Sequence, residues 1–224
     1  MHLIALYDMD KTITRSPTWT PFLIYAGARL APWRLALLPF AGLAVLGYAA
    51  QIIGRARLKE VTQALILGPV VDESALARVA EGFAGGLVQR GVFAQALAQI
   101  AEDRASGRQL VMATASCRFY VGAIAAALGF DAVVATESRH LPGGRVAARL
   151  AGENCYGPAK LDQVKGWFAG LRIARIEADI RFYSDHVSDA PTFEWADEAV
   201  AVNPHPRLRA LALARGWKIV EWQR

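Results

Sequence analysis

The pattern of apolar and polar residues divides the chain into a short first strand, a long helical insertion and a region of alternating elements. Residues 3–7 are all apolar, which is typical of a strand buried on both faces of a parallel sheet. From Val92 onward, helical and strand patterns alternate. The expected helices lie at about 92–105, 118–128 and 207–215, with a further helix that begins at Pro158. The expected strands lie at 109–113, 131–136, 180–183, 199–202 and, at a sheet edge, 217–222, and a hairpin centred on Gly-Gly is expected at 138–150.

This alternation predicts right-handed crossovers and a three-layer, Rossmann-like α/β fold with a mostly parallel sheet. Residues 16–87 interrupt it. They are predicted to be almost wholly helical, with prolines that break the apolar stretches. We therefore expect a main domain made of residues 1–15 and 88–224, and a small all-helical insertion made of residues 16–87.

Composition adds the expectation of an anionic partner. The chain is 54% hydrophobic and has a formal net charge of +5, which suits nucleic acid, anionic lipid or a phosphorylated substrate. It has no aromatic-interleaved basic patch or zinc-knuckle spacing, so we do not expect nucleic acid. Two widely separated cysteines, Cys117 and Cys155, and the lack of a charged leader with a cleavage site indicate a cytoplasmic protein.

Polar side chains follow the predicted strands, beginning with the first. Asp8 and Asp10 come directly after the apolar residues 3–7, and Thr12 follows two residues later. The strand at 109–113 is followed by a second polar group, which consists of Thr114, Ala115 and Ser116. A hydroxyl and the free amides at the start of a helix suit an anion.

Two more groups lie further along the chain. Lys160 falls in the first turn of the helix that begins at Pro158, where the helix dipole disfavours a cation, so its position indicates a role. Asp185 and Asp189 follow the strand at 180–183 and are spaced for one helical turn. Each group alone is compatible with an ordinary helix cap or strand end. Because functional groups gather at the carboxyl ends of parallel strands, we expect all of them at one edge of the sheet.

Four carboxylates, one lysine and one hydroxyl at the same edge favour Mg²⁺-assisted phosphoryl chemistry. Mg²⁺ prefers hard oxygen ligands and retains several waters, so two carboxylates and a phosphate oxygen are sufficient to hold it. Lys160 and Thr114 would bind the remaining phosphate oxygens. The expected cofactor is therefore Mg²⁺, and the expected substrate carries a phosphate.

The order of these motifs, D-x-D-x-T, a strand-end Thr, a Lys and D-x-x-x-D, resembles the haloacid dehalogenase superfamily of phosphatases. The resemblance covers nearly all of the chain outside the insertion. It implies that Asp8 attacks phosphorus to form an aspartyl-phosphate, and that Asp10 protonates the leaving oxygen and then activates water. It further implies Mg²⁺ ligands from Asp8, the backbone carbonyl of Asp10 and Asp185, and a supporting carboxylate from Asp189. Lys160 would neutralise charge in the transition state, Thr114 and Ala115 would bind phosphate, and Thr12 and Ser116 would support the site.

The position of the insertion resembles the helical cap of the phosphoserine-phosphatase-like branch, subfamily IB. Phosphoserine phosphatases carry a Glu shortly after the first motif, which binds the amino group of the substrate. Residues 14–20 of this chain contain no carboxylate. This departure argues against phosphoserine as the substrate.

The insertion contains a long uncharged segment between Arg34 and Arg55. By length alone this segment could cross a bilayer. A single crossing would place Asp8 on one side of the membrane and Lys160 and Asp185 on the other. We therefore exclude a single crossing of the membrane by this segment. Cations on both sides of the segment favour a re-entrant or interface-lying hairpin at an anionic membrane surface, on the inner face of the cytoplasmic membrane. The alternative is a pair of helices buried against itself or in a dimer.

An apolar, Arg-flanked insertion is also similar to that of bacterial phosphatidylglycerophosphate phosphatases of this superfamily. The leading substrate expectation is therefore a lipid-linked phosphomonoester. Three alternatives stay open: a small soluble phosphomonoester, transfer of the phosphoryl group to an alcohol in place of water, and a non-catalytic, membrane-associated interaction module. No residue separates the hydrolase from the phosphotransferase.

Overall fold

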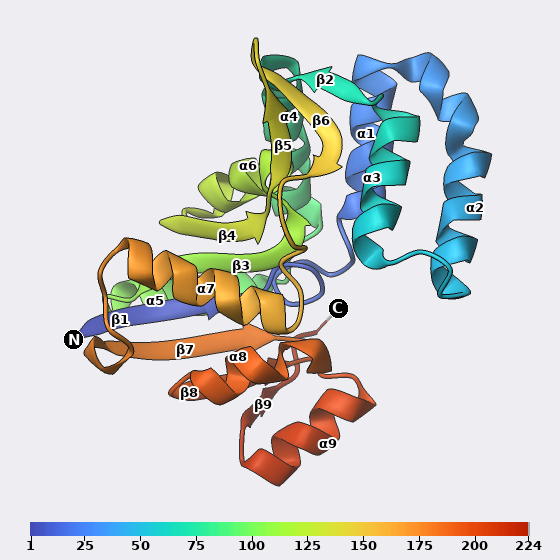
Figure 1. The fold of residues 1–224 in the computed structure, drawn as a ribbon. Helices are drawn as coiled ribbons and strands as arrows, with labels where there is room; N and C mark the ends of the chain where they lie inside the picture. The colour runs from blue at the N-terminus through green and yellow to red at the C-terminus, as the bar shows by residue number, and fades with distance from the viewer. Residues whose placement is uncertain (224) are drawn as a thin grey trace.

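The main sheet of the protein has six parallel strands, with β1 at its centre (Figure 1). The structure is a computed structural model, which describes residues 1–223. The strand order is β4-β3-β1-β7-β8-β9, and every neighbouring pair is parallel. The strands are β1 His2–Tyr7, β3 Gln109–Cys117, β4 Ala132–Thr136, β7 Ala178–Ser184, β8 Glu198–Val202 and β9 Lys218–Val220. The predicted α/β fold with a mostly parallel sheet is confirmed.

Helices cover both faces of this sheet. Along β1, Ala5 and Tyr7 face one core, and Ile4 and Leu6 face the other, all without exposed surface. This explains the unbroken apolar run, because each side of the strand meets a helical layer. On the first face lie α5 Ala94–Ala105 and α6 Arg118–Leu128, and on the second α7 Pro158–Gly170, α8 Ala190–Trp195 and α9 Pro206–Arg215. Two short 3₁₀ turns, η2 Arg175–Glu177 and η3 Val187–Asp189, lie in the connections.

The insertion between β1 and α5 is mainly helical. Its elements are α1 Trp19–Leu30, the 3₁₀ helix η1 Pro32–Leu37, α2 Leu38–Ala49, α3 Arg55–Ile66, β2 Val70–Asp72 and α4 Glu73–Arg90. The helices α1, α2 and α3 stand beyond the carboxyl ends of the main strands, and α2 is outermost (Figure 1).

One strand, β2, is the exception to the expected all-helical insertion. It pairs antiparallel with β6 Arg145–Leu150, which forms the predicted hairpin with β5 Ser138–Leu141. The turn of that hairpin uses Gly143 and Gly144, both with positive φ. Three residues are too few to show a period-2 pattern, so only the partner strand stabilises β2 in this conformation.

The helix α4 joins the end of the insertion to the main domain. Its N-cap is Asp72, whose side chain accepts a hydrogen bond of 2.8 Å from the backbone N–H of Ala75. The helix continues past residue 87 to Arg90 and packs against α6. The first-face core therefore runs without a break from the sheet into α4 and α1.

The strand expected at 109–113 continues to Cys117, with an irregularity at its end. Thr114 pairs with Ala135, and the next paired residue is Cys117, opposite Thr136. The two residues between them, Ala115 and Ser116, form a bulge. They are thus displaced from the ladder at the edge where the polar groups were expected.

One helical stretch, Pro32–Ala49, is long and apolar enough to cross a membrane by length and composition alone. It comprises η1 and α2, and 6% of it is buried. It corresponds to most of the uncharged segment recognised in the sequence.

Candidate active site

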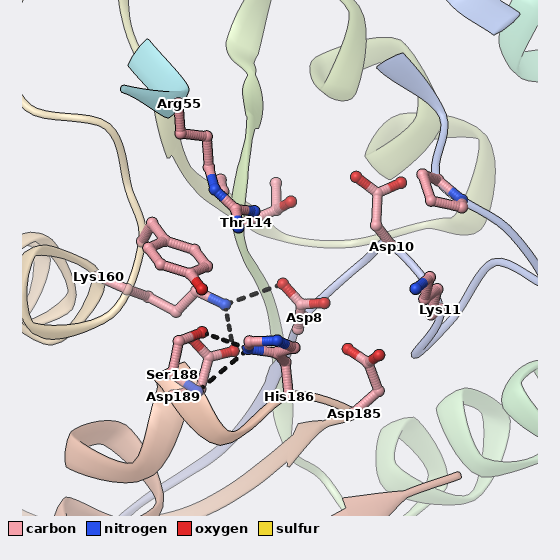
Figure 2. A pocket seen from close by; sticks show the side chains of 13 residues that line it. Asp8, Asp10, Lys11, Arg55, Thr114, Lys160, Asp185, His186, Ser188 and Asp189 are labelled. Atoms are coloured by element: carbon pink, nitrogen blue, oxygen red, sulfur yellow. Dashed lines mark hydrogen bonds and ion pairs between the residues drawn. The ribbon is translucent and has the colours of Figure 1, made fainter. Parts of the chain in front are cut away.

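The predicted polar groups meet at the carboxyl ends of β1, β3 and β7. Asp8 follows β1, and Asp185 follows β7, the strand paired with β1 on one side. Figure 2 shows Asp8 among Lys160, Asp189, Asp185 and Asp10. These side chains line a cavity of about 180 Å³. Its complete lining is Asp8, Asp10, Lys11, Pro17, Arg55, Thr114, Ala115, Tyr156, Lys160, Asp185, His186, Ser188 and Asp189.

Lys160 holds two of the carboxylates. Its Nζ donates hydrogen bonds to Asp8 Oδ1 at 2.8 Å and to Asp189 Oδ2 at 2.6 Å, and all three side chains are buried. Ser184 donates a further hydrogen bond of 2.7 Å to Asp189 Oδ2. Burial opposes the charge on Lys160, but Asp189 and Asp8 outweigh it and raise its pKa, so the lysine stays a cation.

Asp8 and Asp185 are costly to ionise without a further cation. Burial raises the pKa of Asp8 to about 6, although Lys160 acts in the opposite direction. Burial, followed by the charge of Asp8, raises the pKa of Asp185 to about 7. Two buried carboxylates with raised pKa values beside one another are the electrostatic setting in which a bound cation is strongly favoured.

Asp10 is fixed by hydrogen bonds from two other segments. Its Oδ1 accepts from the backbone N–H and the hydroxyl of Thr18, both at 2.8 Å, and its Oδ2 accepts from Ser116 at 2.9 Å. Burial raises the pKa of Asp10, with these hydrogen bonds acting against it. Asp10 thus connects the start of the insertion to the bulge of β3, and the expected supporting residue Ser116 contacts it directly.

A tight turn after β1 positions the first motif. The carbonyl oxygen of Met9 accepts hydrogen bonds from the backbone N–H groups of Ile13 at 2.9 Å and Thr14 at 3.0 Å. Lys11 has a positive φ of 64° within this turn. Thr12, which was expected to support the site, is buried and donates a hydrogen bond of 3.3 Å to Asp8 Oδ2.

Thr114 and Ala115 also line the cavity. The hydroxyl of Thr114 is buried and accepts a hydrogen bond of 3.2 Å from the backbone N–H of Ser116. The carbonyl oxygen of Ala115 accepts from Thr136 at 2.7 Å and also from the ammonium of Lys59. The bulge is therefore held in place from the sheet and from the insertion.

Several residues of the cavity were not predicted as site residues. Arg55, at the start of α3, reaches toward the cavity, with its guanidinium 4.0 Å from the centre of the Tyr156 ring (Figure 2). The sequence presented Arg55 only as a flank of the uncharged segment, and Tyr156 carried no signal. His186 contacts Ser188, through Nδ1 at 2.8 Å from its hydroxyl, and burial lowers the pKa of this histidine.

The donor set fits a hard cation. Asp8 and Asp185 offer carboxylate oxygens, and the buried Oδ1 of Asp189 has no hydrogen-bond partner within residues 1–223. In the same part of the chain, no three His, Cys, Asp or Glu side chains cluster as a metal site. The ligand set expected from the sequence needs only two carboxylates and one backbone oxygen, and a hard cation such as Mg²⁺ would take its remaining ligands from water and substrate oxygens.

Comparison with known proteins finds a family match that covers most of the chain. A family model described as haloacid dehalogenase-like hydrolase matches residues 5–194. A Streptomyces azureus protein named for the inhibition of morphological differentiation is 28% identical over 224 residues, which are 98% of this chain and 78% of that relative. A phosphoserine phosphatase of Mycobacterium tuberculosis is 33% identical over 120 residues, which are 53% of this chain and 37% of the relative. This chain thus spans little more than a third of the mycobacterial protein.

A solved structure shows a similar fold over the full chain. It belongs to a protein with unknown function from Bordetella pertussis Tohama I, which is 25% identical. The superposition has a TM-score of 0.87 and covers 98% of both chains. The insertion and the main domain are therefore both part of a shared architecture.

Proposed function

This chain belongs to the haloacid dehalogenase-like hydrolases and is a phosphatase of that family, and we propose that it cleaves phosphomonoesters by transfer of the phosphoryl group to Asp8. The observation that carries the proposal is the placement of Asp8 at the end of the central strand, 2.8 Å from the buried ammonium of Lys160. A carboxylate oxygen in this position is a nucleophile, and Lys160 compensates the charge that develops on phosphoryl oxygens.

The proposed reaction has two displacement steps. In the first, an oxygen of Asp8 bonds to phosphorus while the ester P–O bond breaks, and Asp10 gives a proton to the leaving oxygen. In the second, Asp10 takes a proton from water, whose oxygen bonds to phosphorus as the bond from Asp8 breaks. The raised pKa of Asp10 supports a role as proton carrier, and its hydrogen bonds to Thr18 and Ser116 orient it.

We infer that the cation is Mg²⁺, bound by Asp8, Asp185 and the backbone carbonyl of Asp10. When bound, it neutralises phosphoryl oxygens and keeps Asp8 ionised. Asp189 then orients Lys160, with which it shares a hydrogen bond of 2.6 Å. Thr114, the backbone of Ala115 and Lys160 would bind the phosphate.

The charges at the cavity support an anionic leaving group. Besides the four aspartates and Lys160 assigned above, the part of the lining formed by residues 1–223 carries the cations Lys11 and Arg55 and no further carboxylate. A substrate ammonium group, as in phosphoserine, would lack a partner beyond those aspartates. A lipid-linked phosphomonoester such as phosphatidylglycerophosphate carries a phosphodiester anion near its terminal phosphate, which suits Arg55. We therefore propose a lipid-linked substrate at the cytoplasmic face of the membrane. A small soluble phosphomonoester, as for the mycobacterial relative, is the alternative.

A phosphate-release screen tests the proposal. We expect Mg²⁺ to support turnover of phosphomonoesters and a chelator to abolish it. Arg55→Ala should raise KM for substrates with a second anionic group and leave p-nitrophenyl phosphate nearly unaffected. Equal turnover of the lipid and its water-soluble headgroup analogue would contradict the lipid assignment. Added glycerol that captures labelled phosphoryl groups in competition with water would identify a phosphotransferase.

A further inference from the structure

Helix α2 and the segments next to it expose a run of large apolar side chains. Within α2 only Ala41 is buried. The exposed members, here called the apolar ridge, are Trp33, Leu38, Phe40, Leu43, Val45, Leu46 and Ile52. Single exposed apolar residues are normal on a protein surface, but a concentration of them on one element is typical of a contact surface.

The ridge lies within a segment that carries positive charge only. Residues 11–59 contain seven basic residues and no Asp or Glu. Without them, the chain has 18 basic against 20 acidic residues, so the whole positive excess of the protein resides in this segment. Arg29 precedes the ridge, Arg34 lies within it next to Trp33, and Arg55 and Arg57 follow it. Of these, Arg57 forms an ion pair of 3.2 Å with Glu60. The guanidinium of Arg34 lies 4.5 Å from the ring centre of the exposed Trp33, an arrangement suited to a membrane interface.

The charge distribution decides between two occupants of the ridge. A second copy of the chain, docked through the same ridge, would bring Arg29, Arg34 and Arg55 of both copies together. The carboxylate that follows the segment, Glu60, is already engaged by Arg57 and Arg149. An anionic bilayer offers apolar chains to the ridge and phosphate groups to the flanking arginines at the same time. The bilayer is therefore the occupant that satisfies both observations.

The fold sets the depth of this contact. Both ends of α2 return to the protein, because α1 packs against α4 and α3 packs against β6. The stretch Pro32–Ala49 has the length to cross a membrane, but the chain before it and the chain after it are both anchored to the same domain. It can therefore lie in the interface but cannot make a single crossing of the hydrocarbon. Near its end, the hydroxyl of Tyr48 accepts a hydrogen bond of 3.0 Å from Arg55, which lines the cavity. The mouth of the site therefore opens beside the end of the ridge.

We propose that the apolar ridge seats this protein on an anionic membrane surface, with α2 in the plane of the interface and the cavity mouth at the level of the headgroups. Docking to the membrane does not depend on the reaction. The further statement that the substrate lies in the membrane rests on the proposed function. A phosphate at the headgroup level would then reach Asp8 without leaving the bilayer.

Vesicle flotation tests the docking. We expect the full chain to float with vesicles of phosphatidylcholine mixed with phosphatidylglycerol, and to stay in the soluble fraction with phosphatidylcholine alone. The variant Phe40→Ser/Leu43→Ser/Leu46→Ser should lose about tenfold or more of its vesicle affinity, because three inserted side chains are removed. It should still hydrolyse p-nitrophenyl phosphate, since none of the three lines the cavity.

A matched control replaces exposed apolar residues of the main domain. The variant Leu171→Ser/Ile176→Ser/Leu213→Ser removes three large apolar side chains that are also exposed but lie outside the ridge, and it should float like the wild type. Asp8→Asn should also float, so that docking and catalysis can fail separately. A wild type that stays soluble with the anionic vesicles would overturn the proposal. The proposal would also be overturned if light scattering showed a wild-type dimer that the ridge variant does not form, and if neither protein floated with the vesicles.

Discussion

Lys59 of the insertion is hydrogen-bonded to the backbone carbonyl oxygen of Ala115, in the bulge that lines the candidate site. It also donates a hydrogen bond of 2.5 Å to Asn154 Oδ1. The side chain is 7% exposed, and within residues 1–223 no carboxylate forms an ion pair with it, so burial lowers its pKa. A buried cation with neutral partners is costly, and its position links α3 to the wall that we propose binds phosphate.

We expect Lys59→Met to change stability and activity in opposite directions. The substitution removes the cost of burying a charge. The single hydroxyl proton of Thr136 still lies within reach of the carbonyl oxygen of Ala115 at 2.7 Å and of Asn154 Oδ1 at 3.0 Å. Unfolding by urea should therefore occur at an equal or higher concentration. Activity should fall about tenfold in kcat/KM, because α3 no longer fixes the bulge. Lys59→Arg is the control that keeps the charge. Unchanged kinetics in Lys59→Met would show that Lys59 does not position the site.

Lys160→Met should abolish most activity and also destabilise the protein. It leaves Asp8 and Asp189 as neighbouring buried carboxylates without their cation, which typically costs about 3–5 kcal/mol. The loss in kcat should be about 10³-fold. In Lys160→Met/Asp189→Asn, one carboxylate is gone, so part of the stability should return while activity stays low. Recovery of activity in the double variant would contradict the assignment of Lys160.

The stability of the metal-free protein should depend on the ionisation of Asp185. Burial raises its pKa from 3.8 to about 7, so the folded state binds this proton more tightly than the unfolded state. The stabilising effect is complete below about pH 4 and is lost as the pH rises toward 7. The Asp185→Asn variant has no carboxylate to ionise at this position, so its stability should not fall over this pH range for this reason. In chelator at pH 8 it should be more stable than the wild type by roughly 2–4 kcal/mol, with a smaller difference at pH 4. Urea unfolding with equal differences at both pH values would contradict this expectation.

The buried Asp103 should hold the ends of β1 and β7 together. Its Oδ2 accepts hydrogen bonds from Tyr7 at 2.5 Å and Tyr183 at 2.9 Å, and its Oδ1 pairs with Arg181 at 2.5 Å. The two tyrosine rings are stacked, and they immediately precede the segments that carry Asp8 and Asp185. Asp103→Leu should cost about 3–5 kcal/mol in unfolding experiments, and Tyr7→Phe about 1 kcal/mol. Equal, small effects of both variants would show that the network contributes little.

Much of the fold was predictable because its strands are buried on both faces. Residues 3–7 and the later apolar runs stand out as strands, and the parallel arrangement brings Asp8, Thr114 and Asp185 to one edge wherever the connecting helices lie. In contrast, the pairing of β2 with β6 joins segments more than 70 residues apart, and β2 is too short to carry a pattern of its own.

The contributions of the insertion to the site could not be predicted from local patterns. Lys59 lies in a helix with charged neighbours and has the sequence pattern of a solvent-facing residue, and its burial arises only from the contact of α3 with the bulge of β3. The same holds for Arg55, which contacts Tyr156 across 101 positions of sequence. The bulge at Ala115 and Ser116 also depends on the register with β4.

The central claim is that Asp8 accepts the phosphoryl group, and acid quenching during turnover tests it most directly. With a labelled aryl phosphate, whose leaving group departs easily, we predict that peptide mapping locates the label on Asp8 in the wild-type protein. The Asp8→Asn variant should carry no label and should show no turnover. A wild type that turns over without label at Asp8, together with an active Asp8→Asn variant, would contradict the account.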